Sequence, residues 1–345
     1  MRIVIVSFTE AGRSISKKLN QVLKEKGYKV EVFGKYPEGI VEKLEGSIYE
    51  FTKKCFEEEV QGIIFIGALG IAVRAIAANI VSKGKDPAVI VMDDSERFVI
   101  PVLSGHIGGA NELASYISEK LQVMPVITTA TDGHGVFAID TWAVKNQCEI
   151  LDISKIKYVS SALLRGEKVG FVCDYPVEGK LPEGFEYGTN HKVGICISRN
   201  INQKPFEDTL NLIPKEYIIG VGCRRNVMPN IFEEVLNNVL GNMEISTTQI
   251  MNIVSIDIKA KEAAILNYCK KNRLEFITYS AEELLKVEGE FTSSAFVKSI
   301  TGVDNVCERS AQKASEDLNG ELVLRKKACN GVTVAISKIN WRCRF

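Results

Sequence analysis

The chain has 345 residues, enough for two or three domains with buried cores, and its 43 basic residues balance 43 acidic ones. This balance excludes a whole-molecule field that would attract nucleic acid, and no apolar run approaches the roughly 18 residues of a membrane span. Nine cysteines stand singly, without the spacing of a zinc site or a disulfide framework, which favours a globular protein of the cytoplasm with no metal site of its own.

The first 145 residues alternate short apolar segments with helical patterns. We expect strands over residues 2–8, 28–33, 62–67, 88–94, 97–103 and 124–132. Helices between them carry apolar residues at helical spacing, as Ile15, Leu19 and Leu23 do. Pro101 indicates an edge or a bulge in its strand. The alternation predicts a three-layer α/β domain around a parallel sheet.

The rest of the chain divides at a less regular middle. Residues 146–216 contain a helical pattern, a strand over 191–198 and a stretch at 199–216 that we interpret as a linker. Strand and helix patterns then resume and end in an expected hairpin over 320–338. The sequence therefore predicts an α/β fold with an N-terminal domain over 1–145, a small α+β middle region over 146–216 and a separate α/β domain over 217–345.

The first candidate loop is "GALG", residues 67–70, between an apolar strand and a helix. Gly67 and Gly70 allow a ligand to approach the backbone, and the amides of a helix N-terminus favour anions. Arg74 is the only charged residue from 62 to 82, so it should need an anionic partner if it is buried. The alternative is a partner within the protein or a side chain that reaches solvent. A P-loop is excluded, because its lysine is missing.

The second candidate loop is "SGHIGGAN", where a histidine stands between glycines at a strand-to-helix junction. Its candidate site residues are Ser104, Gly105, His106, Gly108, Gly109 and Asn111. A neutral imidazole there can act as a base, an acid or a hydrogen-bond donor, although it can also simply brace the loop. The glycines permit positive φ, and Asn111 or a neighbour can cap the helix. A nucleophilic Ser104 stays open, but outside a GxSxG motif.

The third candidate segment is "TTATDGHG", residues 128–135, at the end of an expected strand. Thr128, Thr129 and Asp132 offer a polar wall for a ligand, or a turn in which they cap the backbone. Asp93 and Asp94 end another strand, where a turn is favoured over a Mg²⁺ site. If 88–94 and 97–103 form a hairpin, the first and second loops point to opposite edges of the sheet, and the sequence leaves this open.

The fourth candidate is "GVGCRRN", residues 220–226, again between a strand and a helix. Gly220 and Gly222 permit close approach of a ligand, and Arg224 and Arg225 provide paired positive charge for carboxylates. A nucleophilic Cys223 is an alternative that no nearby histidine supports.

These stretches together resemble one known family. In that order "GALGIAVRAIA", "KDPAVIVMD", "LSGHIGGANELA" and "VITTATD" resemble the N-terminal part of the cobalt-precorrin-5A hydrolases, and "GVGCRRN", "SIDIKAKEAAI" and "TVAISK" resemble their C-terminal domain. The resemblance implies a role in anaerobic cobalamin biosynthesis, where the family opens the δ-lactone of a cobalt corrinoid and releases acetaldehyde. It implies no cofactor, because the substrate carries its own cobalt. The sequence departs from the family pattern at two places: in "VIPVLSG" Pro101 stands in a strand that is usually unbroken, and in "NVCERSA" an acidic–basic pair replaces a more alanine-rich stretch.

The resemblance also implies roles for the candidate residues. Acidic groups of the corrinoid are expected to bind Arg74, Arg224 and Arg225. The catalytic roles are a physical inference from the residues themselves: His106 acts as the base, directly or through water, and Asp132 orients His106 or helps a later proton transfer. The backbone amides of Gly108 and Gly109 are expected to hold the oxyanion. The expected partner is the cobalt-corrinoid substrate, and contacts with other enzymes of the cobalamin pathway stay open. Two other functions also stay open: a corrinoid or anion carrier without catalysis, and a nucleotide-binding α/β enzyme that uses the first and fourth loops for phosphates.

Overall fold

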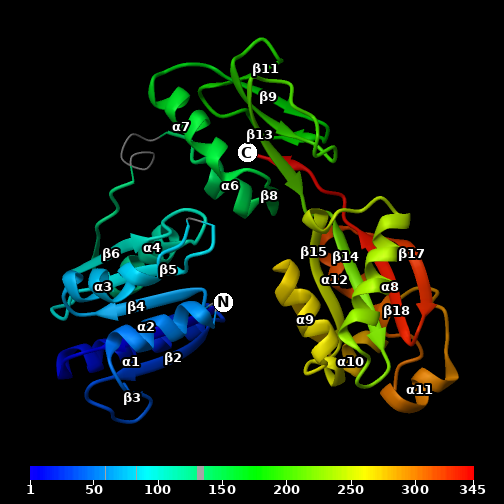
Figure 1. The fold of residues 1–345 in the computed structure, drawn as a ribbon, viewed down its shortest axis with the longest axis horizontal. Coiled ribbons are helices and arrows are strands. Elements are labelled where there is room, and N and C mark those ends of the chain that lie inside the picture. Colours follow the sequence, from blue (N-terminus) through cyan, green and yellow to red (C-terminus); the bar gives the residue numbers. More distant parts are fainter. Residues whose placement is uncertain (59, 83, 130–135) are drawn as a thin grey trace. The chain divides into compact units, whose positions relative to one another are not determined.

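In the computed structural model the described residues are 1–345 except 59, 83 and 130–135, and they form two compact units. One unit consists of Met1–Val144 with Ile156–Glu167, and the other of Lys145–Lys155 with Lys168–Phe345 (Figure 1). The protein has an α/β fold with several parallel and mixed sheets, which confirms the predicted class. The chain has three large sheets, of seven, five and five strands, but only two compact units. The predicted division into three domains therefore stays a prediction.

A seven-stranded sheet forms the centre of the N-terminal unit. Its strands are β1 (Arg2–Ser7), β2 (Lys29–Gly34), β3 (Glu42–Lys43), β4 (Gly62–Ile66), β5 (Ala88–Met92), β6 (Phe98–Leu103) and β7 (Met124–Pro125). They lie in the order β3-β2-β1-β4-β5-β6-β7. Strands β1 to β5 are parallel, and every residue of β4 and β5 is buried. Such continuous apolar runs are typical of strands covered on both faces.

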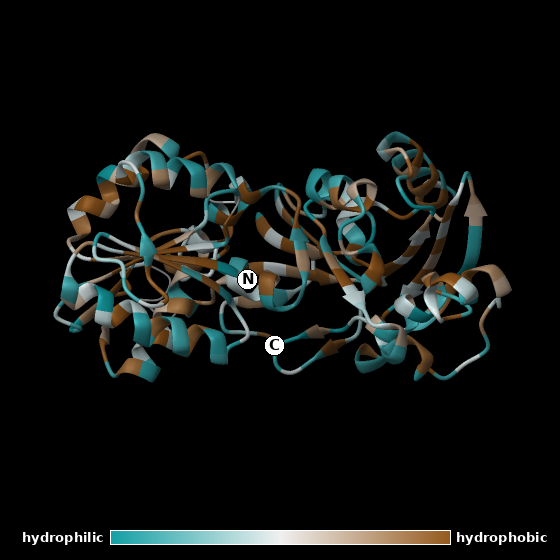
Figure 2. Cartoon of the chain, turned by 90° about the horizontal axis from the view of Figure 1, so that it is seen from below, coloured by the Kyte–Doolittle hydropathy of each residue, from teal (hydrophilic) through white to brown (hydrophobic). Residues whose placement is uncertain are grey.

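Helices cover both faces of this sheet (Figure 2). They are α1 (Glu10–Glu25), α2 (Ile48–Glu57), α3 (Leu69–Ile76) with the 3₁₀ turn η1 (Ala77–Asn79) and α4 (Ala110–Leu121). A further helix, α6 (Ile139–Lys145), follows at the end of this unit in the sequence. Leu19 of α1 and Ile117 of α4 share one core cluster with Ile5, while Ala72 of α3 packs with Val6 in another. Successive residues of a strand point to opposite faces, so the two clusters are the two sides of a three-layer domain, as predicted.

Strand β6 turns back on β5 in an antiparallel hairpin. Asp93 closes the turn, because its Oδ1 accepts hydrogen bonds from the backbone N–H groups of Arg97 (2.8 Å) and Phe98 (2.6 Å), which confirms the expected turn. The pairing is irregular opposite Pro101, where a bulge was expected. Because β6 runs opposite to β4, the loop after β6 and the loop after β4 lie at opposite edges of the sheet.

The middle of the chain forms a five-stranded sheet in the order β11-β9-β12-β13-β8. Its elements are β8 (Cys148–Ile150), η2 (Ile153–Lys155), α7 (Ile156–Leu164), β9 (Val169–Cys173), β11 (Phe185–Tyr187), β12 (Val193–Ile197) and β13 (Asp208–Pro214). The linker expected over 199–216 is therefore wrong, because β13 is a strand with six buried residues. Asn211 and Pro214 obscured its apolar pattern; Asn211 is accommodated by donating to the carbonyl of Gln203.

The C-terminal domain contains a second five-stranded sheet, in the order β16-β15-β14-β18-β17. Its strands are β14 (Tyr217–Cys223), β15 (Ile250–Ile256), β16 (Glu275–Tyr279), β17 (Glu321–Cys329) and β18 (Val332–Lys338); β10 (Val177–Glu178) pairs separately with β19 (Cys343–Arg344). The helices are α8 (Pro229–Asn242), η3 (Thr247–Gln249), η4 (Asp257–Lys259), α9 (Ala263–Asn272), α10 (Ala281–Leu285), α11 (Ala295–Thr301), α12 (Cys307–Ser315) and η5 (Glu316–Leu318).

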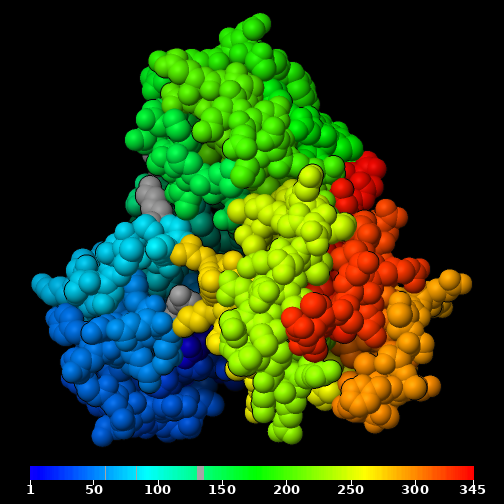
Figure 3. All heavy atoms as spheres, turned by 45° about the vertical axis from the view of Figure 1, so that its right-hand side comes forward, coloured from blue at the N-terminus to red at the C-terminus, as the bar shows by residue number. Residues whose placement is uncertain are grey.

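Two layers of helices cover this sheet. Phe232 of α8 and Ile265 of α9 pack with Ile219 and Val334 in one cluster, and α12 contacts the opposite face of β14. In Figure 3, α8 (yellow-green) and the strands β17 and β18 (red-orange) lie side by side on the surface. The antiparallel β17–β18 pair confirms the predicted terminal hairpin. Throughout the described part of the chain, no helix combines the length and apolar character that crossing a membrane requires.

Candidate functional site

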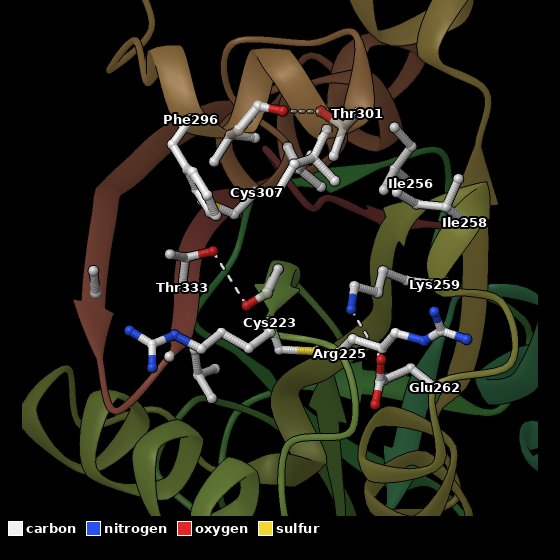
Figure 4. A pocket seen from close by; sticks show the side chains of 18 of the residues that line it. Cys223, Arg225, Ile256, Ile258, Lys259, Glu262, Phe296, Thr301, Cys307 and Thr333 are labelled. Atoms are coloured by element: carbon white, nitrogen blue, oxygen red, sulfur yellow. Dashed lines mark hydrogen bonds and ion pairs between the residues drawn. The ribbon is translucent and has the colours of Figure 1, made fainter.

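A cavity of about 970 Å³ opens in the C-terminal domain where β14 ends (Figure 4). Five segments line it: the loop after β14, the connection from β15 to α9, the helix α11, the start of α12, and the β17–β18 hairpin. The carboxyl ends of parallel strands are the usual place for ligands in α/β sheets.

The glycines of "GVGCRRN" have two different positions. Gly222 borders the cavity beside Thr333, whose hydroxyl donates to the Gly222 carbonyl (3.2 Å). Gly220 is buried and lies outside the lining; a Cβ there would stand 1.9 Å from the carbonyl oxygen of Cys307. Gly220 therefore lets α12 approach β14. The sequence suggested a ligand contact for Gly220, whereas the structure gives it a packing role.

Cations dominate the polar part of the cavity. Among the described residues that line it, five are cationic and one is acidic: Arg224, Arg225, Lys259, Lys261, Lys326 and Glu262. The predicted pair of arginines is thus joined by lysines from two other segments. A chain with balanced total charge therefore concentrates positive charge at this one place, which favours an anionic ligand.

The acidic residue of the lining holds the site together. Its Oε2 atom lies 2.9 Å from the Nζ of Lys259, and the two side chains are only 8% and 13% exposed. Its Oε1 accepts a hydrogen bond from the backbone N–H of Asn226 (3.1 Å). Glu262 thereby fixes both Lys259 and the loop that carries the two arginines.

Cys223 points into the same region, but its chemistry is that of a neutral thiol. Burial raises the pKa of Cys223 to about 11, more than the neighbouring Lys259 lowers it. A thiol is a weak nucleophile, so the geometry does not favour the nucleophilic alternative for Cys223.

A histidine–carboxylate pair marks a second candidate site, in the N-terminal unit. Nδ1 of His106 lies 2.9 Å from Oδ2 of Asp140 at the start of α6, and each side chain is 14% exposed. The sequence analysis missed Asp140. It expected Asp132 to orient the imidazole, and Asp132 lies outside the described residues.

The glycine-rich loop around His106 is compact. Ser104 has a φ of 56°, and its hydroxyl donates to the Asp86 carbonyl (2.9 Å). Gly108 has no room for a side chain, because a Cβ would lie 2.4 Å from the Cβ of Ser104. The N–H of Gly109 donates to the His106 carbonyl (2.9 Å), so of these two amides only that of Gly108 stays a candidate for an oxyanion. Hydrogen bonding of Ser104 to the backbone does not favour it as a nucleophile.

The second and third candidate loops meet. Nδ2 of Asn111 donates to the hydroxyl of Thr129 (3.0 Å), and Gly105 lies close to the Asn111 side chain, since a Cβ at Gly105 would come within 2.7 Å of it. Gly109 occupies the N-cap of α4, and no side chain caps this helix end. Asn111 lies within the first turn instead, so the expected capping by its side chain is wrong. Thr128 is exposed near this edge.

The "GALG" loop lies at the opposite edge of the same sheet. Gly67 has a φ of 147°, and Gly70 is exposed. Arg74 is exposed as well, so the expectation of a buried cation that needs an anion is wrong and the solvent alternative holds. The antiparallel hairpin of β5 and β6 separates this loop from His106, which answers the question that the sequence left open.

Three family models match successive parts of the chain. Cobalamin synthesis G N-terminal covers residues 50–132, Cobalamin biosynthesis central region covers 137–214, and Cobalamin synthesis G C-terminus covers 217–337. A cobalt-precorrin-5A hydrolase of Salmonella typhimurium is 32% identical over 288 residues, which is 79% of this chain and 81% of the relative. This chain belongs to the cobalt-precorrin-5A hydrolase family.

Other members of the family extend over nearly the whole chain. The cobalt-precorrin-5A hydrolase of Priestia megaterium is 29% identical, covering 97% of this chain and 94% of the relative. A crystal structure of a cobalamin biosynthesis protein G homolog from Sulfolobus solfataricus is 24% identical, with a TM-score of 0.43 over 98% of this chain and 97% of that one. The resemblance stated from the motifs is thus confirmed.

The structure adds residues to the two candidate sites of this cobalt-precorrin-5A hydrolase homologue that sequence reasoning missed: Asp140 beside His106, and Lys261, Glu262, Phe296, Ile300 and Lys326 in the cavity after β14. The run "IKAKE" directly after a strand could have indicated Lys261 and Glu262, as the strand-end rule did for the arginines. Lys326 lies about a hundred residues from Arg224 in the sequence, and no local pattern links the two.

Proposed function

We propose that this chain hydrolyses cobalt-precorrin-5A to cobalt-precorrin-5B and releases acetaldehyde. Its relatives in Salmonella typhimurium and Priestia megaterium carry the name of this activity. The observation on this chain that carries the proposal is the cavity after β14, which combines five cationic side chains with apolar walls. A corrinoid ring has apolar faces and acidic groups along its rim, so its chemistry matches both parts of the lining.

The proposal assigns acid–base chemistry to His106. The carboxylate of Asp140, 2.9 Å from Nδ1, orients the ring and stabilises the imidazolium that forms when His106 takes up a proton from the attacking water. The activated water adds to the lactone carbonyl, and the acyl C–O bond breaks to leave a carboxylate and an alcohol. Loss of the alcohol proton then lets the adjacent C–C bond break: two carbons leave as acetaldehyde and the electron pair stays on the ring.

Binding and acid–base chemistry are assigned to separate groups of residues. Arg224 and Arg225 bind carboxylates of the ring, and Gly108 supplies the candidate amide for the oxyanion. Five further residues stay proposed substrate contacts, although their surroundings in the structure do not indicate a particular ligand: Gly67, Gly70, Arg74, Thr128 and Thr129.

The test is acetaldehyde release. Purified chain is incubated with cobalt-precorrin-5A under anaerobic conditions, and acetaldehyde is measured with alcohol dehydrogenase and NADH. We expect one acetaldehyde for each corrinoid converted. Corrinoid binding without acetaldehyde would support the carrier instead, and thermal stabilisation by ATP or NAD alone would support the nucleotide-binding enzyme.

A further inference from the structure

Helix α11 leaves two large apolar side chains uncovered beside the cationic cavity. Phe296 and Ile300 are 73% and 62% exposed, and both belong to its lining. They are four residues apart, so they lie on the same face of the helix. Figure 4 shows Phe296 on one side of the cavity and Ile258, which is 58% exposed, on the other. Apolar side chains gathered at a cavity rim are typical of a ligand site.

The helix itself is firmly attached to the domain. Ser294 caps its N-terminus by accepting from the N–H of Val297. Val297 packs against a buried cluster that contains Ile256 and Val303. Val297 thus joins α11 to the core while it also lines the cavity with Phe296 and Ile300, so the exposure of these two side chains does not result from a detached helix.

The acidic residue of "NVCERSA" anchors the segments on both sides of the cavity. Glu308 is fully buried, and its carboxylate accepts the N–H (2.9 Å) and hydroxyl (2.8 Å) of Thr292, just before α11. It also accepts the backbone N–H of Lys326 (2.7 Å), within a stretch of β17 where the register shifts. A single carboxylate thus fixes the start of the α11 segment and the strand that carries a cation of the lining.

The basic residue of the same pair holds the preceding loop. Arg309 forms an ion pair with Asp304 (2.9 Å) and donates to the carbonyls of Leu284 (3.2 Å) and Val287 (2.9 Å). Asp304 in turn accepts the N–H of Ser294 through its backbone carbonyl (2.9 Å). Glu308 and Arg309 therefore position the segment that carries α11.

We propose that α11 is the platform for the flat face of a corrin-type ring. Phe296 and Ile300 pack against the face of the ring, Arg224 and Arg225 bind carboxylates on its rim, and Glu308 acts as a positioning residue for the platform. The cavity lies near the upper end of the volumes of small-molecule sites, about 300–1,000 Å³. That the ligand is a corrin-type ring rests on the proposed function. That α11 provides apolar contacts and the arginines provide charged contacts rests on the residues that line the cavity.

Two soluble probes separate the face of the ring from its rim. Dicyanocobyrinic acid and dicyanocobinamide share ring and cobalt, but the first carries carboxylates where the second carries neutral amides. The Phe296→Ala/Ile300→Ala double variant should weaken binding of both probes by similar factors, about tenfold or more, because the lost contact area is the same. Arg224→Gln/Arg225→Gln should weaken binding of the acid by a larger factor than binding of the amide, because charge-assisted hydrogen bonds are lost. Binding is measured by calorimetric titration of the full chain.

Leu285→Ala is the matched control, since Leu285 is an exposed apolar residue of the same domain outside the lining. Its affinity for both probes should equal that of the wild type. In a Glu308→Ala background the Phe296→Ala/Ile300→Ala replacements should have a smaller effect, because the platform is already displaced. A purely structural loss at Glu308 would instead leave their effects additive, and circular dichroism verifies that each variant is folded.

The outcomes distinguish this inference from the proposed function. If the wild type binds neither probe, or if the double variant binds both as tightly as Leu285→Ala does, the platform is wrong whether or not acetaldehyde is released. If the probes bind through α11 but cobalt-precorrin-5A yields no acetaldehyde, the platform stands and the hydrolase proposal fails. Displacement of the probes by ATP or NAD would assign the cavity to nucleotides and overturn the inference.

Discussion

Nδ1 of His106 and Oδ2 of Asp140 lie 2.9 Å apart, although 34 residues separate them in the chain. The glycine loop after β6 presents the imidazole, and the start of α6 supplies the carboxylate. A carboxylate at a ring nitrogen orients the imidazole and stabilises its protonated form. This arrangement makes the pair the strongest candidate for acid–base chemistry in the N-terminal unit.

The first prediction concerns this pair. His106→Ala should lower turnover of cobalt-precorrin-5A by about 10²–10⁴-fold, the usual contribution of a general base. Asp140→Asn should lower it less, because the asparagine oxygen still accepts the Nδ1 proton but lacks the charge that stabilises an imidazolium. Initial rates of acetaldehyde release give both values. Affinity for dicyanocobyrinic acid should be unchanged in both variants, and wild-type turnover in His106→Ala would remove the assignment.

A second prediction tests the packing role of Gly220. A Cβ at this position would collide with the Cys307 carbonyl, so Gly220→Ala must displace α12 from the sheet. We expect a loss of about 1–3 kcal/mol in the free energy of unfolding, as for overpacked cores. Gly241→Ala in α8 is the control: its Cβ meets no atom within 4 Å, and alanine in a helix should be neutral or stabilising by up to about 1 kcal/mol. Urea denaturation measures both, and equal stabilities would contradict the packing role.

The third prediction concerns the thiol of Cys223. Burial raises its pKa to about 11, so near pH 7 only about one molecule in ten thousand carries the thiolate. Alkylation of Cys223 by iodoacetamide should therefore be slow at pH 7 and rise about tenfold per pH unit toward pH 11. Peptide mass spectrometry follows the site, with the exposed Cys329 as the reference thiol. Rapid alkylation of Cys223 at neutral pH would revive the nucleophilic alternative.

The fourth prediction concerns stability in acid. Burial raises the pKa of Glu308, but the hydrogen bonds from the N–H of Lys326 and from Thr292 together lower it by more. The net result is a pKa below the ordinary value of 4.5. A carboxyl whose pKa is lower in the folded state contributes stability above its unfolded pKa and loses it as the pH falls through the folded value. Glu308→Gln should therefore cost about 1–3 kcal/mol at pH 7, and the difference from wild type should shrink below pH 4.5. Urea titrations at pH 7 and in acid measure it, and a difference independent of pH would exclude the carboxylate as its source.

The sequence by itself determined most of the strands and helices around the site. One expectation in the N-terminal unit is wrong: the strand expected over 124–132 extends only over Met124–Pro125 among the described residues. The fully buried strands β4 and β5 and the β17–β18 hairpin follow from apolar runs and their spacing, which act between neighbours in the chain. The same reasoning located Gly222, Arg224 and Arg225 at the end of a strand, and the ordered motifs identified the family. It failed at β13, where two residues that interrupt the apolar pattern are accommodated by a sheet assembled from distant segments.

Only the tertiary structure decided which residues act together. The direction of β6 placed the "GALG" and His106 loops at opposite edges, and packing of α6 brought Asp140 to His106. The cavity after β14 assembles from segments about a hundred residues apart, so no short window links Lys326 or the apolar face of α11 to the arginines. Local patterns follow from the conformational preferences of neighbouring residues, whereas a site depends on contacts between residues far apart in the chain, and these form only when the apolar faces of separate elements are buried against one another.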